Sequence, residues 1–229
     1  MATEEEIGKR SAAGQDSRWS RASVGRFSLY LRRLEDVLAE GNTRVSSHTL
    51  GESIGLTDTQ IRKDLASLGS LGQPGIGYDV AELIAAIRST LGIDRTWNAI
   101  LVGVGNLARA LLRYQGFVER GFRIVGLFDA DPEKIGTTVE GLQIHSPDRM
   151  KEVIEATGAE LGILTVPAHS VQNVADGMIQ AGIRGLLNFA PGIVRVPEGV
   201  RVVGVDLTVQ LEQLAFLVHL GDDARISTR

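Results

Sequence analysis

The spacing of apolar residues changes partway along the chain. In the first part they recur at helical spacing, as at Phe27 and Leu31. Further on, short apolar runs alternate with amphipathic segments, and Ala99–Val102 has no polar break, which is typical of a strand buried in a parallel sheet. The pattern predicts an α/β protein with a helical domain over residues 21–93 and a strand–helix domain over residues 94–204.

Two short segments of the first domain predict a helix-turn-helix. Ser46 or Ser47 is placed to cap a helix that ends before Gly55, which allows a tight turn. Thr57, followed three residues later by Gln60, is a capping box that opens a second helix. The second helix would then present its polar face as a recognition helix.

The polar residues of that second helix are of the types that read base edges and contact phosphates. The glycine-rich stretch 69–77 then predicts a two-stranded wing. Residues 18–44 contain six Arg and only three acidic residues, although the whole chain carries a net charge of −4. The predicted DNA contacts are Ser47, Thr59, Gln60, Arg62, Lys63 and Gly75.

A glycine-rich turn follows the strand Ala99–Val102 and precedes a helix predicted over residues 106–115. The turn is Gly103-Val104-Gly105-Asn106-Leu107-Ala108, which matches G-x-G-x-x-G/A. Gly103 permits the tight turn, Gly105 lets the backbone approach a pyrophosphate, and Ala108 allows close packing of the helix. The phosphates would meet the N-terminal end of that helix.

An acidic residue, Asp129, ends the next predicted strand, 24 positions after Gly105. A carboxylate at this place hydrogen-bonds both ribose hydroxyls of NAD and repels a 2′-phosphate. The sequence therefore predicts NADH and NAD+ as ligands in preference to NADP(H). Asp131 and Pro132 are expected to cap a following helix.

Two later strands end in short polar and proline-containing segments at the carboxyl edge of the predicted sheet, where ligands bind in such folds. They are candidates for adenosine and nicotinamide contacts. The alternative is that the prolines only mark the start of loops. The predicted contacts are Thr165, Val166, Pro167, Asn188, Ala190 and Pro191.

Several functions are disfavoured by what the chain does not contain. There is no Cys, and the four His are scattered, so no metal site is expected. No apolar stretch reaches 18 residues, and residues 1–20 predict a disordered tail without a signal peptide, which favours a cytoplasmic protein. No substrate domain and no proton-donor pair follow Pro191, which argues against an NAD-dependent oxidoreductase. That enzyme and a CoA-binding module remain the alternatives.

Residues 205–229 predict one more helix, which is apolar around most of its circumference. A helix of this kind does not lie on one surface. It is expected either between the two domains or against a partner subunit.

Taken together, the motifs "IRKDLASLG", "VGVGNLARAL", "FDADPEKIG", "LTVPAHSVQNVAD", "NFAP" and "VDLTVQL" resemble the Rex family of redox-sensing repressors, from about Val24 to Leu220. The resemblance implies a homodimer with a winged helix, a Rossmann domain and a domain-swapped C-terminal helix. It also implies release from palindromic operator DNA on binding NADH. The family's switch network matches Arg32, Tyr114 and Asp206, with the nicotinamide near Tyr114.

Two departures from the family pattern stand out. The wing sequence "GQPGIG" lacks the basic residue that relatives often carry there, so one phosphate contact is in doubt. Leu207 stands where some relatives have Phe, which puts aromatic stacking on the nicotinamide in doubt.

Overall fold

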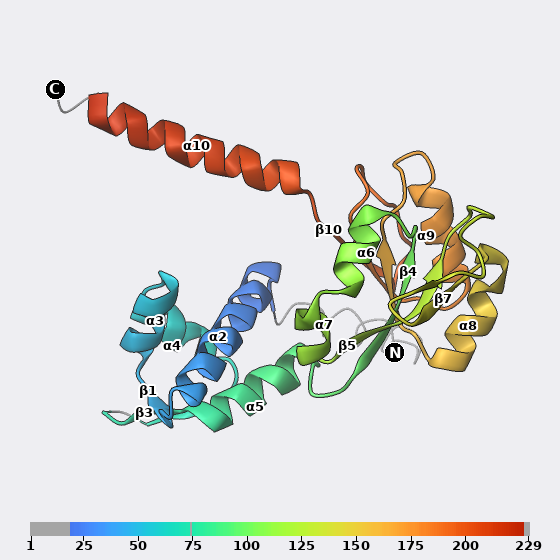
Figure 1. Cartoon of the computed structure of the whole chain (residues 1–229). Coiled ribbons are helices and arrows are strands. Elements are labelled where there is room, and N and C mark those ends of the chain that lie inside the picture. The colour runs from blue at the N-terminus through green and yellow to red at the C-terminus, as the bar shows by residue number, and fades with distance from the viewer. Residues whose placement is uncertain (1–18, 74, 227–229) are drawn as a thin grey trace, which may run out of the picture. The chain divides into compact units, whose positions relative to one another are not determined.

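The computed structural model describes residues 19–73 and 75–226 (Figure 1). It divides into two compact units, Met1–Arg95 and Thr96–Arg229. The predicted disordered tail falls outside the described residues, except for Trp19 and Ser20. These two belong to the fold, because the Trp19 ring packs edge-on against Phe27 at 5.2 Å and Ser20 caps the first described helix.

The first unit is a winged helix, as predicted. It consists of helices α2 (Arg21–Ala39), α3 (Ser47–Ile54), α4 (Asp58–Ala66) and α5 (Val80–Leu91), and strands β1 (Arg44–Val45), β2 (Gly72–Gln73) and β3 (Gly77–Asp79). The strands form an antiparallel sheet in the order β1-β3-β2. All four helices contribute to one apolar core, whose fully buried side chains include Phe27, Tyr30, Leu34, Leu50, Ile61, Leu65, Leu83 and Ile87.

The turn between α3 and α4 follows from local sequence chemistry. The Ser46 hydroxyl accepts a hydrogen bond from the Thr49 amide, and Gly55 ends α3 with φ of 71°. The Thr57 hydroxyl accepts from the Gln60 amide at 3.2 Å, which is one half of the expected capping box. The expected return bond from the Gln60 side chain to the Thr57 amide does not form, because the Gln60 side chain donates to Asp64 instead.

The second unit contains a seven-stranded sheet in the order β10-β9-β8-β4-β5-β7-β6. Every pairing is parallel except that of β6 with β7. The strands are β4 (Trp97–Val102), β5 (Phe122–Phe128), β6 (Thr138–Val139), β7 (Leu142–His145), β8 (Leu161–Leu164), β9 (Gly185–Asn188) and β10 (Arg201–Gly204).

Helices cover both faces of this sheet, and the side chains of β4 alternate between two cores. Ile100 and Val102 pack with residues of α8 (Met150–Thr157) and α9 (Val171–Gln180). Ala99 and Leu101 pack with residues of α6 (Asn106–Leu112). The sheet is therefore doubly wound, as predicted, and its switch point lies between β4 and β8, where ligands bind in such folds.

Two local expectations are wrong. The helix predicted over residues 106–115 is broken into α6 and α7 (Gln115–Glu119), and Tyr114 lies between them. No helix follows Asp131, because residues 131–136 form a turn that leads into the antiparallel pair β6–β7. Asp131 still acts as a cap there, accepting a hydrogen bond from the Glu133 amide at 3.0 Å.

The last helix, α10 (Leu207–Ile226), leaves large apolar side chains exposed to solvent. Every side chain described in it is exposed, including Leu211 at 65% and Leu217 at 64%. Over the described residues, α10 and the other helices are too short or too polar to cross a membrane.

Candidate functional site

The glycine turn lies at the carboxyl end of the central strand β4. Gly103 has φ of 95°, and a Cβ there would come within 2.7 Å of Val166 Cγ1 and 2.8 Å of the Thr165 carbonyl oxygen. Gly105 is different, because a Cβ on it would meet no heavy atom within 4 Å. Gly105 also precedes α6, which has no side-chain cap. The turn therefore leaves open space at the N-terminal end of a helix, where N–H groups are available to an anion.

The remaining positions of the motif shape this turn. Ala108 is fully buried against the sheet, which needs a small side chain there. Val104 is buried as well, whereas Asn106 and Leu107 are exposed on the first turn of α6.

Asp129 connects the glycine turn to the end of β5. Its Oδ2 accepts a hydrogen bond from the Val104 amide at 2.8 Å, and its Oδ1 accepts one from the Asp131 amide at 2.9 Å. The residue is only 9% exposed. Its carboxylate therefore helps to hold the turn, in addition to the ribose contact predicted for it. Ionised carboxylate oxygens offer about four acceptor sites, and because Lys134 Nζ also donates to Oδ2, one site remains, on Oδ1, for a ribose hydroxyl.

Lys134 is a neighbour of Asp129 that the sequence reasoning missed. Its Nζ lies 3.0 Å from Asp129 Oδ2 and 3.7 Å from Asp131 Oδ2. Burial would raise the pKa of Asp129, but hydrogen bonds from the Asp131 amide, Lys134 and the Val104 amide outweigh it and lower the pKa. The hydrogen bond to Asp129 raises the pKa of Lys134. The sequence signal for this contact was a lysine five positions after the acid, beyond a proline-containing turn.

The segments after β8 and β9 also lie at this edge of the sheet. Thr165 donates its hydroxyl to the carbonyl oxygens of Val102 and Gly103, at 3.1 and 2.8 Å, so it locks the glycine turn. Val166 lies beside Gly103, and Pro167 is exposed.

Asn188 shapes the loop after β9. It is 3% exposed, donates to the Ala190 carbonyl at 3.0 Å and accepts from the Ala190 amide at 2.9 Å. Ala190 is buried, and Pro191 is exposed. Direct contacts from this loop to a cofactor stay a prediction, since the Asn188 amide is engaged within the protein.

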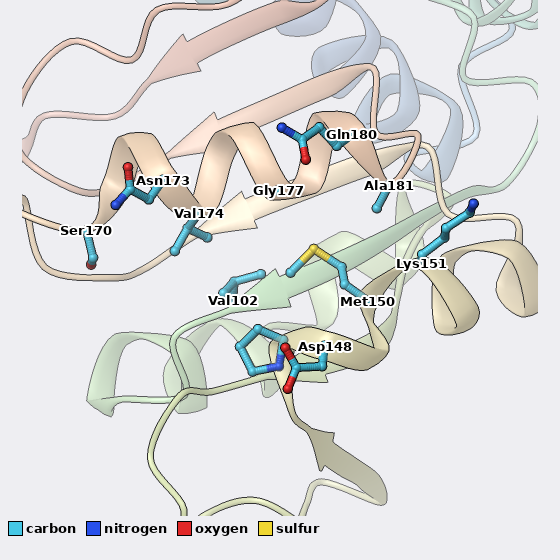
Figure 2. A pocket seen from close by; sticks show the side chains of 11 residues that line it. Val102, Asp148, Met150, Lys151, Ser170, Asn173, Val174, Gly177, Gln180 and Ala181 are labelled. Carbon is cyan, nitrogen blue, oxygen red and sulfur yellow. The ribbon is translucent and has the colours of Figure 1, made fainter.

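A cavity of about 480 Å³ opens on the face of the sheet covered by α8 and α9. Figure 2 shows Val102 at the end of its strand, with Ser170 and Asn173 on one side and Asp148 on the other. The cavity thus reaches the strand end that precedes the glycine turn. None of the sequence-predicted contacts lines it.

The first unit has a cleft of about 750 Å³ between α4 and the wing. It brings together three of the predicted DNA contacts, Ser47, Arg62 and Gly75, and it is also lined by Ser46 and Gln73. Pro74 of the wing lies outside the described residues.

Two glycines hold the wing in place. A Cβ on Gly72 would come within 2.6 Å of the Tyr78 ring, and one on Gly77 within 2.6 Å of the Val45 carbonyl oxygen. The close approach of the wing strands to β1 and to each other thus requires glycine at both positions.

The other predicted DNA contacts lie on α4. Thr59, Arg62 and Lys63 are exposed, and Gln60 is half-buried. Arg62 pairs with Asp58 at 2.7 Å and donates to the Ser47 hydroxyl at 3.3 Å, which orients it toward the cleft.

Ion pairs neutralise part of the arginine excess before α3. Arg26 is paired with Asp64, Arg33 with Glu40. These pairs neutralise charge at two of the arginines, whereas Arg32 and Arg44 are exposed.

The three residues matched to the switch network occupy distinct places. Arg32 is exposed on α2. Tyr114 is 57% exposed before α7, its ring edge-on to Phe117 at 5.2 Å. Asp206 accepts hydrogen bonds from the Thr208 and Val209 amides at 2.9 and 3.4 Å, and so opens α10.

No group of three or more His, Asp or Glu side chains within residues 19–73 and 75–226 is arranged to hold a metal ion.

Two family models match the chain, one on each unit. The "putative DNA-binding protein N-terminus" model matches residues 20–66, and the "CoA binding domain" model matches residues 94–192. The matches agree with a DNA-binding unit followed by a Rossmann-like nucleotide-binding unit.

Relatives that match over most of their length identify the family more narrowly. The chain is 46% identical to the redox-sensing transcriptional repressor Rex of Carboxydothermus hydrogenoformans, over 86% of this chain and 95% of that protein. It is 45% identical to the Rex protein of Desulfitobacterium hafniense, over 86% and 94%.

Solved structures agree with these relatives. A crystal structure of RSP with β-NAD+ and operator DNA matches with a TM-score of 0.84 and 33% identity, over 90% of this chain and 95% of that one. The structure of RSP with β-NADH matches with a TM-score of 0.82 and 32% identity, over 90% and 97%. RSP is described as a Rex-family repressor. The similarity thus extends through both units, and the chain belongs to the Rex family of redox-sensing transcriptional repressors.

Proposed function

We propose that this chain is a DNA-binding repressor that senses the NADH/NAD+ ratio and releases palindromic operators when it binds NADH. The observation that carries the proposal is the link from Asp129 to the Val104 amide, at 2.8 Å, in a chain whose other unit is a winged helix. This link holds the acid that we propose binds the ribose against the glycine turn. The solved relative with both β-NAD+ and operator DNA supports the same pairing of ligands.

The residues present fit a dinucleotide. The open space beside Gly105 would admit a pyrophosphate, and the amides at the start of α6, from Asn106 to Ala108, would donate to it. Asp129 would accept from the ribose hydroxyls. The proposed contacts also include Gly103, Val104, Leu107, Tyr114 and the segments after β8 and β9, with Thr165, Val166, Pro167, Asn188, Ala190 and Pro191.

In the DNA-binding unit, α4 would enter the major groove and the wing would lie along the backbone. Thr59 and Gln60 are near the start of α4, where recognition helices contact base edges. Ser47, Arg62, Lys63 and Gly75 would contact phosphates, with Arg62 already turned toward the cleft.

The exposed apolar surface of α10 supports a homodimer with exchanged C-terminal helices. Leu211, Leu214 and Leu217 are each more than half exposed, whereas burying one such side chain is worth about 1.5 to 3 kcal/mol. A second copy of this chain would cover that surface. A symmetric dimer also suits a palindromic operator, because its two half-sites are related by the same two-fold symmetry.

Sensing requires that the chain bind NADH better in one dimer arrangement than in the other. An apolar environment disfavours the positively charged nicotinamide of NAD+, so the reduced ring is favoured there. Recognition helices must be about 34 to 36 Å apart to fit half-sites one turn apart. A change in that separation would break the fit, and near-complete release takes a coupling of about 3 to 5.5 kcal/mol.

Arg32, Tyr114 and Asp206 would form the switch network. They would supply charge-assisted hydrogen bonds that exist in only one dimer arrangement, as the family resemblance implies. The fold would then couple the nucleotide site to the DNA-binding surface without any catalytic step. We accordingly infer that the chain is not an enzyme and acts in the cytoplasm, where operator DNA and NADH meet.

The match of the second unit to a CoA-binding model keeps CoA as a competing ligand. Asp129 argues against it, because a carboxylate in this position favours a ribose with both hydroxyls free.

The experiment is a fluorescence anisotropy titration of a palindromic duplex with the purified protein. NADH, NAD+, NADPH and CoA are then added in parallel. We expect release by NADH at the lowest concentration. Equal release by NAD+ would refute redox sensing, and release by CoA alone would favour the competing ligand. Steady consumption of NADH in the presence of small carbonyl compounds would refute the non-enzymatic role.

A further inference from the structure

The recognition helix α4 contains a buried acid, Asp64, that the mechanism above does not use. Asp64 is 6% exposed. Its Oδ2 accepts from Arg26 Nε at 2.5 Å and from the Tyr30 hydroxyl at 2.6 Å. Its Oδ1 accepts from Arg26 Nη2 at 2.8 Å and from Gln60 Nε2 at 2.9 Å. All four acceptor sites of the carboxylate are therefore filled, two of them by one bidentate guanidinium.

This cluster joins two helices that are far apart in sequence. Arg26 and Tyr30 lie on α2, whereas Asp64 and Gln60 lie on α4. Burial alone would raise the pKa of Asp64, but hydrogen bonds from Arg26 and Tyr30 outweigh it and lower the pKa below its ordinary value. The carboxylate stays ionised at neutral pH and fastens α4 to α2.

The ionised carboxylate also decides how the Gln60 amide is oriented. An ionised carboxylate only accepts hydrogen bonds, so Gln60 must turn its Nε2 toward Asp64. One N–H of Nε2 is used in this way. Oε1 and the second N–H form the other edge of the amide, and neither has a hydrogen-bond partner among the residues that the structure describes. That edge presents one acceptor beside one donor.

An acceptor beside a donor is the pattern that complements adenine in the major groove, where N6 donates and N7 accepts. We propose that Asp64 is a positioning residue for base readout, which holds Gln60 ready to bind adenine at one position of each half-site. The proposal rests on the proposed function, since it requires that α4 enter the major groove. A glutamine without this support would lose side-chain freedom on binding and could present either edge.

The test is selection of bound sequences from a duplex library with randomised half-sites, followed by affinity measurements on single-base variants. For the wild-type chain we expect one position per half-site at which adenine is preferred by about 5- to 150-fold. Gln60→Ala should remove the preference at that position and keep the others, because Ala at a half-buried helix position keeps the fold.

Two further variants test Asp64 itself. The triple variant Arg26→Met, Tyr30→Phe and Asp64→Leu replaces the whole buried cluster by apolar groups, a change that is often neutral for stability. We expect it to bind DNA with an unchanged salt dependence but without the adenine preference. Asp64→Asn, which keeps the side-chain shape, serves if the triple variant does not fold. It puts an amide donor or a weaker acceptor against Gln60 and should likewise lose the preference.

Glu52→Gln is the matched control, since Glu52 is an exposed acid of the same unit whose Oε1 lies 3.3 Å from His48 Nε2, away from the Asp64 cluster. It should retain the wild-type preference. If Gln60→Ala or the Asp64 variants kept the adenine preference, the inference would be overturned while the proposed function stood. If the wild-type chain bound no duplex at all, both the proposed function and this inference would fail.

Discussion

The two glycines of the nucleotide turn provide a prediction in which the same change, glycine to alanine, lowers stability at one position and NADH affinity at the other. Gly103→Ala should destabilise the protein, because its Cβ would come within 2.7 Å of Val166 Cγ1 and 2.8 Å of the Thr165 carbonyl oxygen. Gly105→Ala should leave stability unchanged, because its Cβ would meet no heavy atom within 4 Å. That same Cβ would instead occupy the space proposed for the pyrophosphate.

The size of each effect can be estimated. At Gly103, a positive φ of 95° costs an alanine about 1 to 2 kcal/mol, and the close contacts add about 1 to 3 kcal/mol. A loss of about 2 to 5 kcal/mol corresponds to a melting temperature lower by roughly 5 to 20 °C. At Gly105 we expect NADH affinity to fall by roughly tenfold or more, which is at least about 1.4 kcal/mol.

Thermal melting with and without NADH measures both effects at once. NADH at 100 times its Kd should stabilise the wild-type protein by about 2.7 kcal/mol. Gly105→Ala should melt like the wild type without NADH and lose most of the stabilisation by NADH. Calorimetric titration then gives the affinity directly. Unchanged NADH affinity in Gly105→Ala would refute the placement of the pyrophosphate, and a wild-type melting temperature in Gly103→Ala would refute the account of the turn.

Further predictions concern the acid, the last helix and the switch. Asp129→Asn should weaken NADH binding and strengthen NADPH binding, because Lys134 would then lose the nearer of its two carboxylate partners and become available to a 2′-phosphate; an unchanged ratio of NADH to NADPH affinity by calorimetry would contradict this. Because folding lowers the pKa of Asp129, its stabilising contribution is complete above about pH 4 and is lost as pH falls through the folded pKa. Melting between pH 3 and 6 should therefore show a shallower decline in Asp129→Asn than in the wild type. Leu211→Glu should give monomers by light scattering, whereas Gln213→Glu on the same helix should not, and a dimeric Leu211→Glu would rule out α10 as the interface. Asp206→Ala should bind NADH but release DNA poorly, and Asp206→Asn, which still caps α10, should match it if the charge matters; normal release in both would remove Asp206 from the switch.

Much of this protein is encoded by interactions between residues close in sequence. Ser46 and Thr57 cap helices through amides three residues away. Gly55 ends a helix because it adopts a positive φ that other residues avoid. The apolar run of β4 and the glycine turn after it likewise predict a strand, a turn and a helix. Because these signals act within a few residues, the sequence by itself determined the winged helix and the doubly wound sheet.

Only the tertiary structure decided which polar groups meet across long sequence separations. Thr165 locks the turn at Gly103 from 62 positions away, and Arg26 reaches Asp64 across 38. Gln60 suits a capping box and base readout equally well in the sequence, but the packing of α2 against α4 places a carboxylate beside it. Such pairings depend on how elements pack, and no local pattern of residues contains that information.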